Sequence, residues 1–308
     1  MPLLSGSRLE AARRALLALN PWYEPYAGTG AEPSAASGLQ AARRDAAWRR
    51  ARLGPDVWNR WAQEMLRLAS KARSGPAARL IEDAAIVDFT GATFARAALF
   101  NGFIFPGACS FRRCLFADEA WFSSAQFHGE ADFSGAAFSS AGAWHEQSRF
   151  HGAATFAGAR WAGTAQWRNT TFGGEAAFER CAFRRDVWLA GSSFGSAARF
   201  AGSEFAGDAG FSGCHFAGQA DFSKVHFRDS VGFEGATFAA GAQFDEARFD
   251  RKVWFRRARF EAKVRFDRAR FRNFSELDLT DASFGEGVLA ASGTPDWRDR
   301  SRPSRAAT

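Results

Sequence analysis

Methionine and tyrosine are nearly absent from this chain, whose 308 residues include two of each against 33 phenylalanines. Such a bias indicates one structural position that recurs many times. No apolar run of about 18 residues occurs, so the sequence predicts no membrane-spanning helix. Residues 1–20 carry Arg8, Glu10, Arg13 and Arg14, which interrupt the apolar stretch that a secretory signal peptide needs. We therefore expect a cytoplasmic protein.

Between Phe89 and Phe271, a large residue recurs at alternating spacings of five and six residues. The repeat is therefore eleven residues long, and a pair of repeats spans twice that length. The residue two positions before each large one is nearly always small. Side chains two apart on a strand point the same way. Each short strand is therefore predicted to send one small and one large side chain inward. The large positions are Phe89, Phe94, Phe100, Phe105, Phe111, Phe116, Phe122, Phe127, Phe133, Phe138, Trp144, Phe150 and Phe156, continuing to Phe260, Phe266 and Phe271.

A unit this short cannot bury its own apolar face, so copies must stack into a solenoid. Each pair of repeats supplies four strands, which predicts a square coil. The region 81–284 is predicted to be an all-β solenoid of about 8–9 coils, a rod of roughly 40 Å at the usual strand spacing. Parallel stacking of this kind is expected to wind right-handed.

The repeat units resemble those of the pentapeptide-repeat proteins, as in Ala131-Asp132-Phe133-Ser134-Gly135 and Ala220-Asp221-Phe222-Ser223-Lys224. The resemblance covers about two-thirds of the chain and implies a right-handed quadrilateral β-helix in a bacterial-type protein. The chain departs from the family pattern by using Phe throughout and by adding one residue at every second strand.

One repeat is longer than the others. The step from Phe133 to Phe156 exceeds the regular spacing by a single residue. With Trp144 as the inward residue, the extra position lies between Trp144 and Phe150. We interpret it as a bulge at a corner.

Residues 1–80 are predicted to be a helical segment that ends in a cap. Ala/Arg-rich helices are expected over 7–19 and 39–53, joined by a Pro/Gly/Ser-rich linker over 21–38. A third helix is expected to begin at Pro55 and to end at Gly75-Pro76, and its residues Trp58, Trp61, Met65 and Leu68 fall on one stripe. We expect this stripe to cover the open end of the solenoid, with partner recruitment as the alternative, and we expect the tail 285–308 to be disordered.

Motifs that suggest chemistry have structural explanations in this register. Cys109, Cys114, Cys181 and Cys214 occupy small inward positions, so neither disulfides nor a zinc site is expected. Ser193 lies in a literal G-x-S-x-G match but directly precedes Phe194 within a strand, where no nucleophile elbow forms. His128 and His151 are expected to stack on adjacent coils without the third and fourth ligands that a metal needs. No catalytic residue, cofactor or metal is predicted.

Charge is concentrated at the two ends. Residues 1–80 carry 13 Lys+Arg and 6 Asp+Glu, residues 81–247 carry 12 and 18, and residues 248–272 carry eleven and three. The basic last coil includes the candidate partner-binding residues Arg251, Arg256, Arg257, Arg259, Lys263 and Arg265. Either an anionic partner or ion pairing between coils explains it. Pairing is favoured, because Arg251, Arg256, Arg268 and Arg272 lie one full coil after Asp229, Glu234, Glu246 and Asp250.

Trp121, Trp188 and Trp254 share one outward column and recur at every third coil. Outward tryptophan is typical of protein-binding surfaces, although it also packs flat against neighbours. These three residues complete the set of candidate binding residues.

Two hypotheses of function remain. The favoured one is a non-enzymatic scaffold that binds another macromolecule, most simply a protein. The alternative is a DNA-related role: mimicry of DNA toward gyrase, which the family resemblance suggests, or direct nucleic-acid binding through the basic ends. The sequence does not identify the partner or the oligomeric state.

Overall fold

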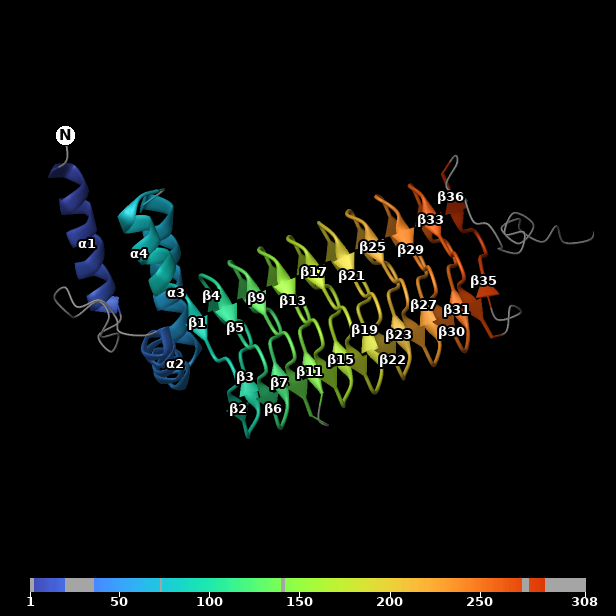
Figure 1. Cartoon of the computed structure of the whole chain (residues 1–308), viewed down its shortest axis with the longest axis horizontal. Helices are drawn as coiled ribbons and strands as arrows, with labels where there is room; N and C mark the ends of the chain where they lie inside the picture. The colour runs from blue at the N-terminus through green and yellow to red at the C-terminus, as the bar shows by residue number, and fades with distance from the viewer. Residues whose placement is uncertain (1–2, 20–35, 73, 140–141, 273–276, 286–308) are drawn as a thin grey trace, which may run out of the picture.

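The computed structural model describes residues 3–19, 36–72, 74–139, 142–272 and 277–285. Four helices come first: α1 (Leu3–Leu19), α2 (Ala36–Arg52), α3 (Pro55–Ala72) and α4 (Pro76–Ala84). Thirty-six strands of two residues follow, arranged in four parallel sheets of nine strands that form the sides of a square rod (Figure 1). The predicted β-helix is confirmed. The predicted linker falls largely, and the tail almost entirely, outside the described residues.

Every fourth strand belongs to the same sheet. Sheet A contains β1 (Val87–Asp88), β5 (Cys109–Ser110), β9 (Ala131–Asp132), β13 (Ala154–Thr155), β17 (Ala176–Ala177), β21 (Ala198–Arg199), β25 (Ala220–Asp221), β29 (Ala242–Gln243) and β33 (Val264–Arg265). Sheet B contains β2 (Thr93–Phe94), β6 (Leu115–Phe116), β10 (Ala137–Phe138), β14 (Arg160–Trp161), β18 (Ala182–Phe183), β22 (Glu204–Phe205), β26 (His226–Phe227), β30 (Arg248–Phe249) and β34 (Arg270–Phe271). Sheet C contains β3 (Ala98–Leu99), β7 (Ala120–Trp121), β11 (Ala143–Trp144), β15 (Ala165–Gln166), β19 (Val187–Trp188), β23 (Ala209–Gly210), β27 (Val231–Gly232), β31 (Val253–Trp254) and β35 (Leu277–Asp278). Sheet D contains β4 (Ile104–Phe105), β8 (Gln126–Phe127), β12 (Arg149–Phe150), β16 (Thr171–Phe172), β20 (Ser193–Phe194), β24 (His215–Phe216), β28 (Thr237–Phe238), β32 (Arg259–Phe260) and β36 (Ser283–Phe284).

The alternation of five and six residues comes from two kinds of corner. After sheets A and C the chain makes a tight turn, in which the Ala92 amide donates to the Phe89 carbonyl at 2.9 Å. Gly91 has a φ of 68° in this turn, a left-handed value that glycine adopts without strain. The corners after sheets B and D are one residue longer. The added residue at every second strand is therefore a regular corner.

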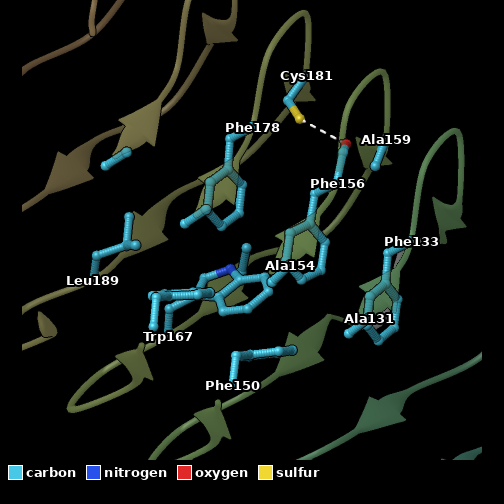
Figure 2. Close-up of a cluster of buried hydrophobic side chains, with 14 of the residues drawn as sticks. Ala131, Phe133, Phe150, Ala154, Phe156, Ala159, Trp167, Phe178, Cys181 and Leu189 are labelled. Atoms are coloured by element: carbon cyan, nitrogen blue, oxygen red, sulfur yellow. Dashed lines mark hydrogen bonds between the residues drawn. The ribbon is translucent and has the colours of Figure 1, made fainter. Parts of the chain in front are cut away.

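Aromatic rings stacked from coil to coil fill the interior. Phe105 and Phe127 have ring centroids 4.6 Å apart and an interplanar angle of 1°. Their separation matches the spacing of parallel strands, about 4.8 Å, so the backbone ladder and the ring stack have the same repeat. Figure 2 shows this alignment for Phe133, Phe156 and Phe178. Each ring buried in this way contributes about 1.5–3 kcal/mol.

The helices cover the first coil, which has no neighbouring strand on that side among the described residues. Trp58 of α3 is fully buried, with its ring centroid 5.3 Å from that of Phe103 and 5.5 Å from that of Phe105. Trp48 of α2 packs edge-on against Phe89 at 5.2 Å. Trp61 and Met65 are also buried, and Leu68 packs against the same core, so this stripe is the buried face of α3.

Side chains of α3 also replace the missing neighbour strand. The Asn59 amide donates to the Gly102 carbonyl at 3.0 Å and accepts from the Ile104 amide at 2.9 Å, while the Trp58 indole donates to the Ile104 carbonyl at 2.7 Å. Edge backbone groups would otherwise be available for pairing with another chain. The sequence pattern does not predict α4, because Gly75-Pro76 is also typical of the end of a helix. Proline is favoured in the first turn of a helix, and Pro76 begins α4.

The predicted position of the extra residue is wrong. Trp144 pairs with Trp121, so both are outward residues of sheet C, and His145 takes the inward place above Phe122. The extra residue therefore lies between Phe138 and Ala143, before β11. The prediction failed because it chose the larger aromatic side chain as the inward one.

His145 is a neutral histidine inside an aromatic stack. Its ring lies 4.9 Å from that of Phe122 and 3.8 Å from that of Trp167, nearly parallel to both. The side chain is fully buried, and neither ring nitrogen has a hydrogen-bond partner among the described residues. Burial lowers the pKa of His145 from 6.5 to about 3. The interior therefore accepts only the neutral imidazole.

Replacing His145 with Phe should stabilise the protein by about 1–3 kcal/mol at neutral pH, because two unsatisfied polar atoms leave the core. Below pH 6.5 the unfolded chain binds a proton that the folded chain excludes until about pH 3. The parent should therefore lose up to about 1.4 kcal/mol per pH unit across this window relative to the variant. Urea unfolding of both proteins from pH 7.5 to pH 4 checks this; a constant difference between them contradicts it.

Trp58→Ala should lower the free energy of unfolding by about 3–5 kcal/mol, because it opens a cavity over Phe103 and Phe105 and removes the hydrogen bond to Ile104. Arg60→Ala, on the exposed side of the same helix, should change it by less than about 0.5 kcal/mol. Urea unfolding measures both, and hydrogen exchange at Phe103 and Phe105 should quicken only in Trp58→Ala. Equal losses in the two variants would show that α3 does not stabilise the first coil through Trp58.

Candidate interaction surfaces

The small interior positions are structural in the described coils. All four cysteines are buried and free, as predicted. The Cys181 thiol donates to the Phe156 carbonyl at 3.1 Å (Figure 2), and the Cys114 thiol donates to the Phe89 carbonyl at 2.9 Å. Burial raises the pKa of Cys114 to about 12, so this thiol stays protonated and unreactive.

Ser192 and Ser193 of the G-x-S-x-G match do not form a nucleophile site. The Ser192 hydroxyl is buried and donates to the Trp167 carbonyl at 2.6 Å. Ser193 belongs to β20 and pairs with Thr171 and His215 on the neighbouring strands. A strand follows β20 where a nucleophile elbow requires a helix.

His128 and His151 stack on adjacent coils as predicted, with ring centroids 4.6 Å apart. Partial burial, followed by the charge of His151, lowers the pKa of His128. Among the described residues, no group of three His, Cys, Asp or Glu side chains could hold a metal ion. No described helix is long and apolar enough to cross a membrane.

The outward column of sheet C begins with an apolar stretch. Leu99 is 63% exposed, and one coil further Trp121 stacks on Trp144 with ring centroids 4.2 Å apart and an interplanar angle of 6°. The Trp121 indole donates to Glu119 at 2.9 Å. Sequence reasoning placed Trp121 in this column but missed Trp144. The small residue Ala143, two positions before His145, was the signal that could have corrected the register.

Trp188 and Trp254 occupy the same column further along but do not join this stack. The Trp188 ring packs against Gly210. A Cβ atom at position 210 would lie 2.6 Å from the Cε3 atom of Trp188. The Arg168 guanidinium lies 5.7 Å from the Trp188 ring centroid. Trp254 pairs with Gly232 on one side and Asp278 on the other. The three predicted tryptophans therefore lie on one face, but only Trp121 contacts another outward tryptophan.

Half of the candidate cations are held by carboxylates within the solenoid. Arg265 lies 3.1 Å from Asp245 and 2.9 Å from Asp267. Arg256 pairs with Asp278 at 3.5 Å, and Arg257 lies 3.9 Å from Asp281. These exposed pairs contribute about 0–1 kcal/mol each.

Of the four ion pairs predicted between coils, the described residues form one, Arg268 with Glu246 at 3.9 Å. The other carboxylates have nearer partners. Asp229 accepts from the Ser230 amide at 2.9 Å, Glu234 accepts from the Ser212 hydroxyl at 2.7 Å, and Asp250 lies 2.8 Å from His226. The predictions for Arg251, Arg256 and Arg272 were therefore wrong.

The structure separates the two basic segments. The N-terminal helices lie at one end of the rod and the basic last coils at the other (Figure 1). Arg251 lies at the corner between sheets B and C, Arg259 faces outward from sheet D, and Lys263 lies at the corner between sheets D and A. The candidate cations therefore surround the rod and do not share one surface with the helices.

Four parallel sheets, short strands and a core of stacked rings define a repeat protein of the quadrilateral β-helix class. The family model for pentapeptide repeats (9 copies) matches residues 100–142, 146–193, 178–226, 189–237 and 222–270, which together make up more than half of the chain. The chain belongs to the pentapeptide-repeat family. The gap in the matches, 143–145, coincides with the irregular third coil.

Comparison with curated proteins and with solved structures gave no match.

Proposed function

We propose that this protein is a non-enzymatic scaffold that binds another protein through sheet C, at a surface formed by Leu99, Trp121 and Trp144. The stacked pair Trp121 and Trp144 is the observation that carries the proposal. Outward positions in this column need no apolar residue to maintain the fold, since Gln166, Gly210, Gly232 and Asp278 occupy them elsewhere. An exposed leucine beside two tryptophans is typical of a protein contact.

This proposal includes no catalytic activity, because the candidate residues have structural roles. The core positions of the described coils hold packed aromatic, aliphatic or small side chains, and the buried hydroxyls and thiols with hydrogen bonds donate to backbone carbonyls. The nucleophile and metal candidates of the sequence lack the base, helix or third ligand that their chemistry requires. The buried reduced thiols fit the cytoplasmic location that the sequence predicts.

Mimicry of DNA receives little support from the charge distribution. A mimic requires a continuous acidic rod, whereas residues 81–247 have a net charge of only −6 (12 basic and 18 acidic residues) and cations follow in the last coils. We therefore do not propose gyrase as the partner.

Photo-crosslinkers placed at Leu99 should capture a specific partner protein in the native cell, whereas those placed at Thr155, on the outer side of sheet A, should not. With that partner purified, Leu99→Gln combined with Trp144→Gln should weaken binding at least about tenfold, because the aromatic contact is lost. Glutamine already occupies position 166 in this column, so the variant should keep its fold and its circular dichroism spectrum.

The matched control is Thr171→Ala combined with Thr237→Ala on sheet D, which should leave the affinity unchanged. Equal crosslinking from sheets A and C, or equal loss of affinity in the two double variants, would overturn the assignment of sheet C.

A further inference from the structure

The outer surface of sheet B at the C-terminal end holds cations that the fold leaves unneutralised. Arg248 and Arg270 lie on this sheet, Arg272 directly follows its last strand, and Arg251 and Lys252 lie at the adjoining corner with sheet C. All five side chains are exposed. Among the described residues, none of the five forms an ion pair. These five residues are called the sheet B patch below.

Two members of the sheet B patch face each other directly. Arg248 of β30 pairs with Arg270 of β34 in the parallel ladder, so their Cα atoms are one strand spacing apart, about 4.8 Å. Like charges directly opposite on a sheet destabilise it. Asp250, the carboxylate that directly follows β30, lies 2.8 Å from the His226 ring instead. The fold thus accepts an unfavourable interaction that an anionic partner would relieve.

This arrangement contrasts with the other cations of the same coils. Arg256, Arg265 and Arg268 each lie within 4 Å of a carboxylate, namely Asp278, Asp245 and Asp267, and Glu246. Elsewhere in these coils, arginine side chains are therefore neutralised by carboxylates. In the sheet B patch, no described carboxylate forms an ion pair with the five cations.

We propose that the sheet B patch binds the phosphate backbone of a nucleic acid, independently of base sequence. Four of its five cations are arginines, whose planar guanidinium groups bind phosphate oxygens in a bidentate manner. The outward residues of β26, β30 and β34 are His226, Arg248 and Arg270, so this stretch offers no apolar side chain for insertion into a lipid surface. The helices at the opposite end of the rod take no part in this contact.

Fluorescence anisotropy with a short duplex DNA of mixed sequence tests the proposal on the full chain. Five phosphate contacts predict that log K falls with log salt concentration with a slope of about −4 to −5. In the triple variant Arg248→Gln, Arg270→Gln, Arg272→Gln the slope should become shallower by about 3, and the affinity at about 50 mM salt should fall at least tenfold. Thermal stability should stay the same or rise, because a repulsive pair is removed.

The matched control replaces the same number of arginines in the same coils: Arg256→Gln, Arg265→Gln, Arg268→Gln. It has the same net charge as the patch variant and should keep the slope and most of the affinity. Absence of DNA binding at low salt, or equal losses in the two triple variants, overturns the proposal. Tighter binding to vesicles containing phosphatidylserine than to DNA, lost in the patch variant, would assign the surface to a membrane and also overturn it.

Discussion

The stacking of aromatic rings at the spacing of β-strands is the interaction on which the rest of this structure depends. Neighbouring phenylalanine rings within a stack lie between 4.4 Å apart, as in Phe127 and Phe150, and 5.3 Å apart, as in Phe227 and Phe249. Hydrogen bonding fixes the same repeat from coil to coil. Each ring covers the one below it, so a substitution affects two interfaces. This double constraint explains why one residue type occupies almost every large inward position.

A core of this kind leaves chemistry to the outer columns. Inward positions alternate between large, mostly aromatic side chains and small ones, and the buried serines and three of the four cysteines form hydrogen bonds to carbonyls of the preceding coil. The outward positions have no such requirement, and sheet C shows the range from Trp144 to Gly210 to Asp278. Differences within one outward column therefore report on function more directly than differences in the core do.

Periodicity made the interior predictable but did not determine the surface partners. The positions of the cysteines and the contact of Trp58 with the first coil follow from register and from the stripe of α3. The partners of Arg251 and Arg272 do not, because Asp229 accepts from the neighbouring Ser230 amide and Asp250 lies 2.8 Å from the His226 ring. An arginine and a carboxylate one coil apart lie close in space, yet nearby hydrogen-bond donors compete for the carboxylate.

Helix α4 was missed for a different reason. Pro76 is consistent with both the end of one helix and the start of the next.

The third coil has an unfavourable side chain inside the solenoid and a stacked tryptophan pair on the outside. The extra residue lies before β11, so the strand keeps the order small, outward, inward with Ala143, Trp144 and His145. Inside, His145 leaves two polar atoms without partners; outside, Trp144 stacks on Trp121. Natural proteins violate the rules of packing mainly where function requires it.

The inward column of sheet C departs from phenylalanine more often than the other three do. Trp167 and Leu189 follow His145 in successive coils, whereas the inward positions of sheets A, B and D hold phenylalanine except at Trp161. Side chains of different size and shape cover one another less evenly than identical rings do. The inward column of sheet C therefore has less regular stacking than the other three columns. The least regular stack of the core therefore lies directly beneath the face that carries the outward tryptophans.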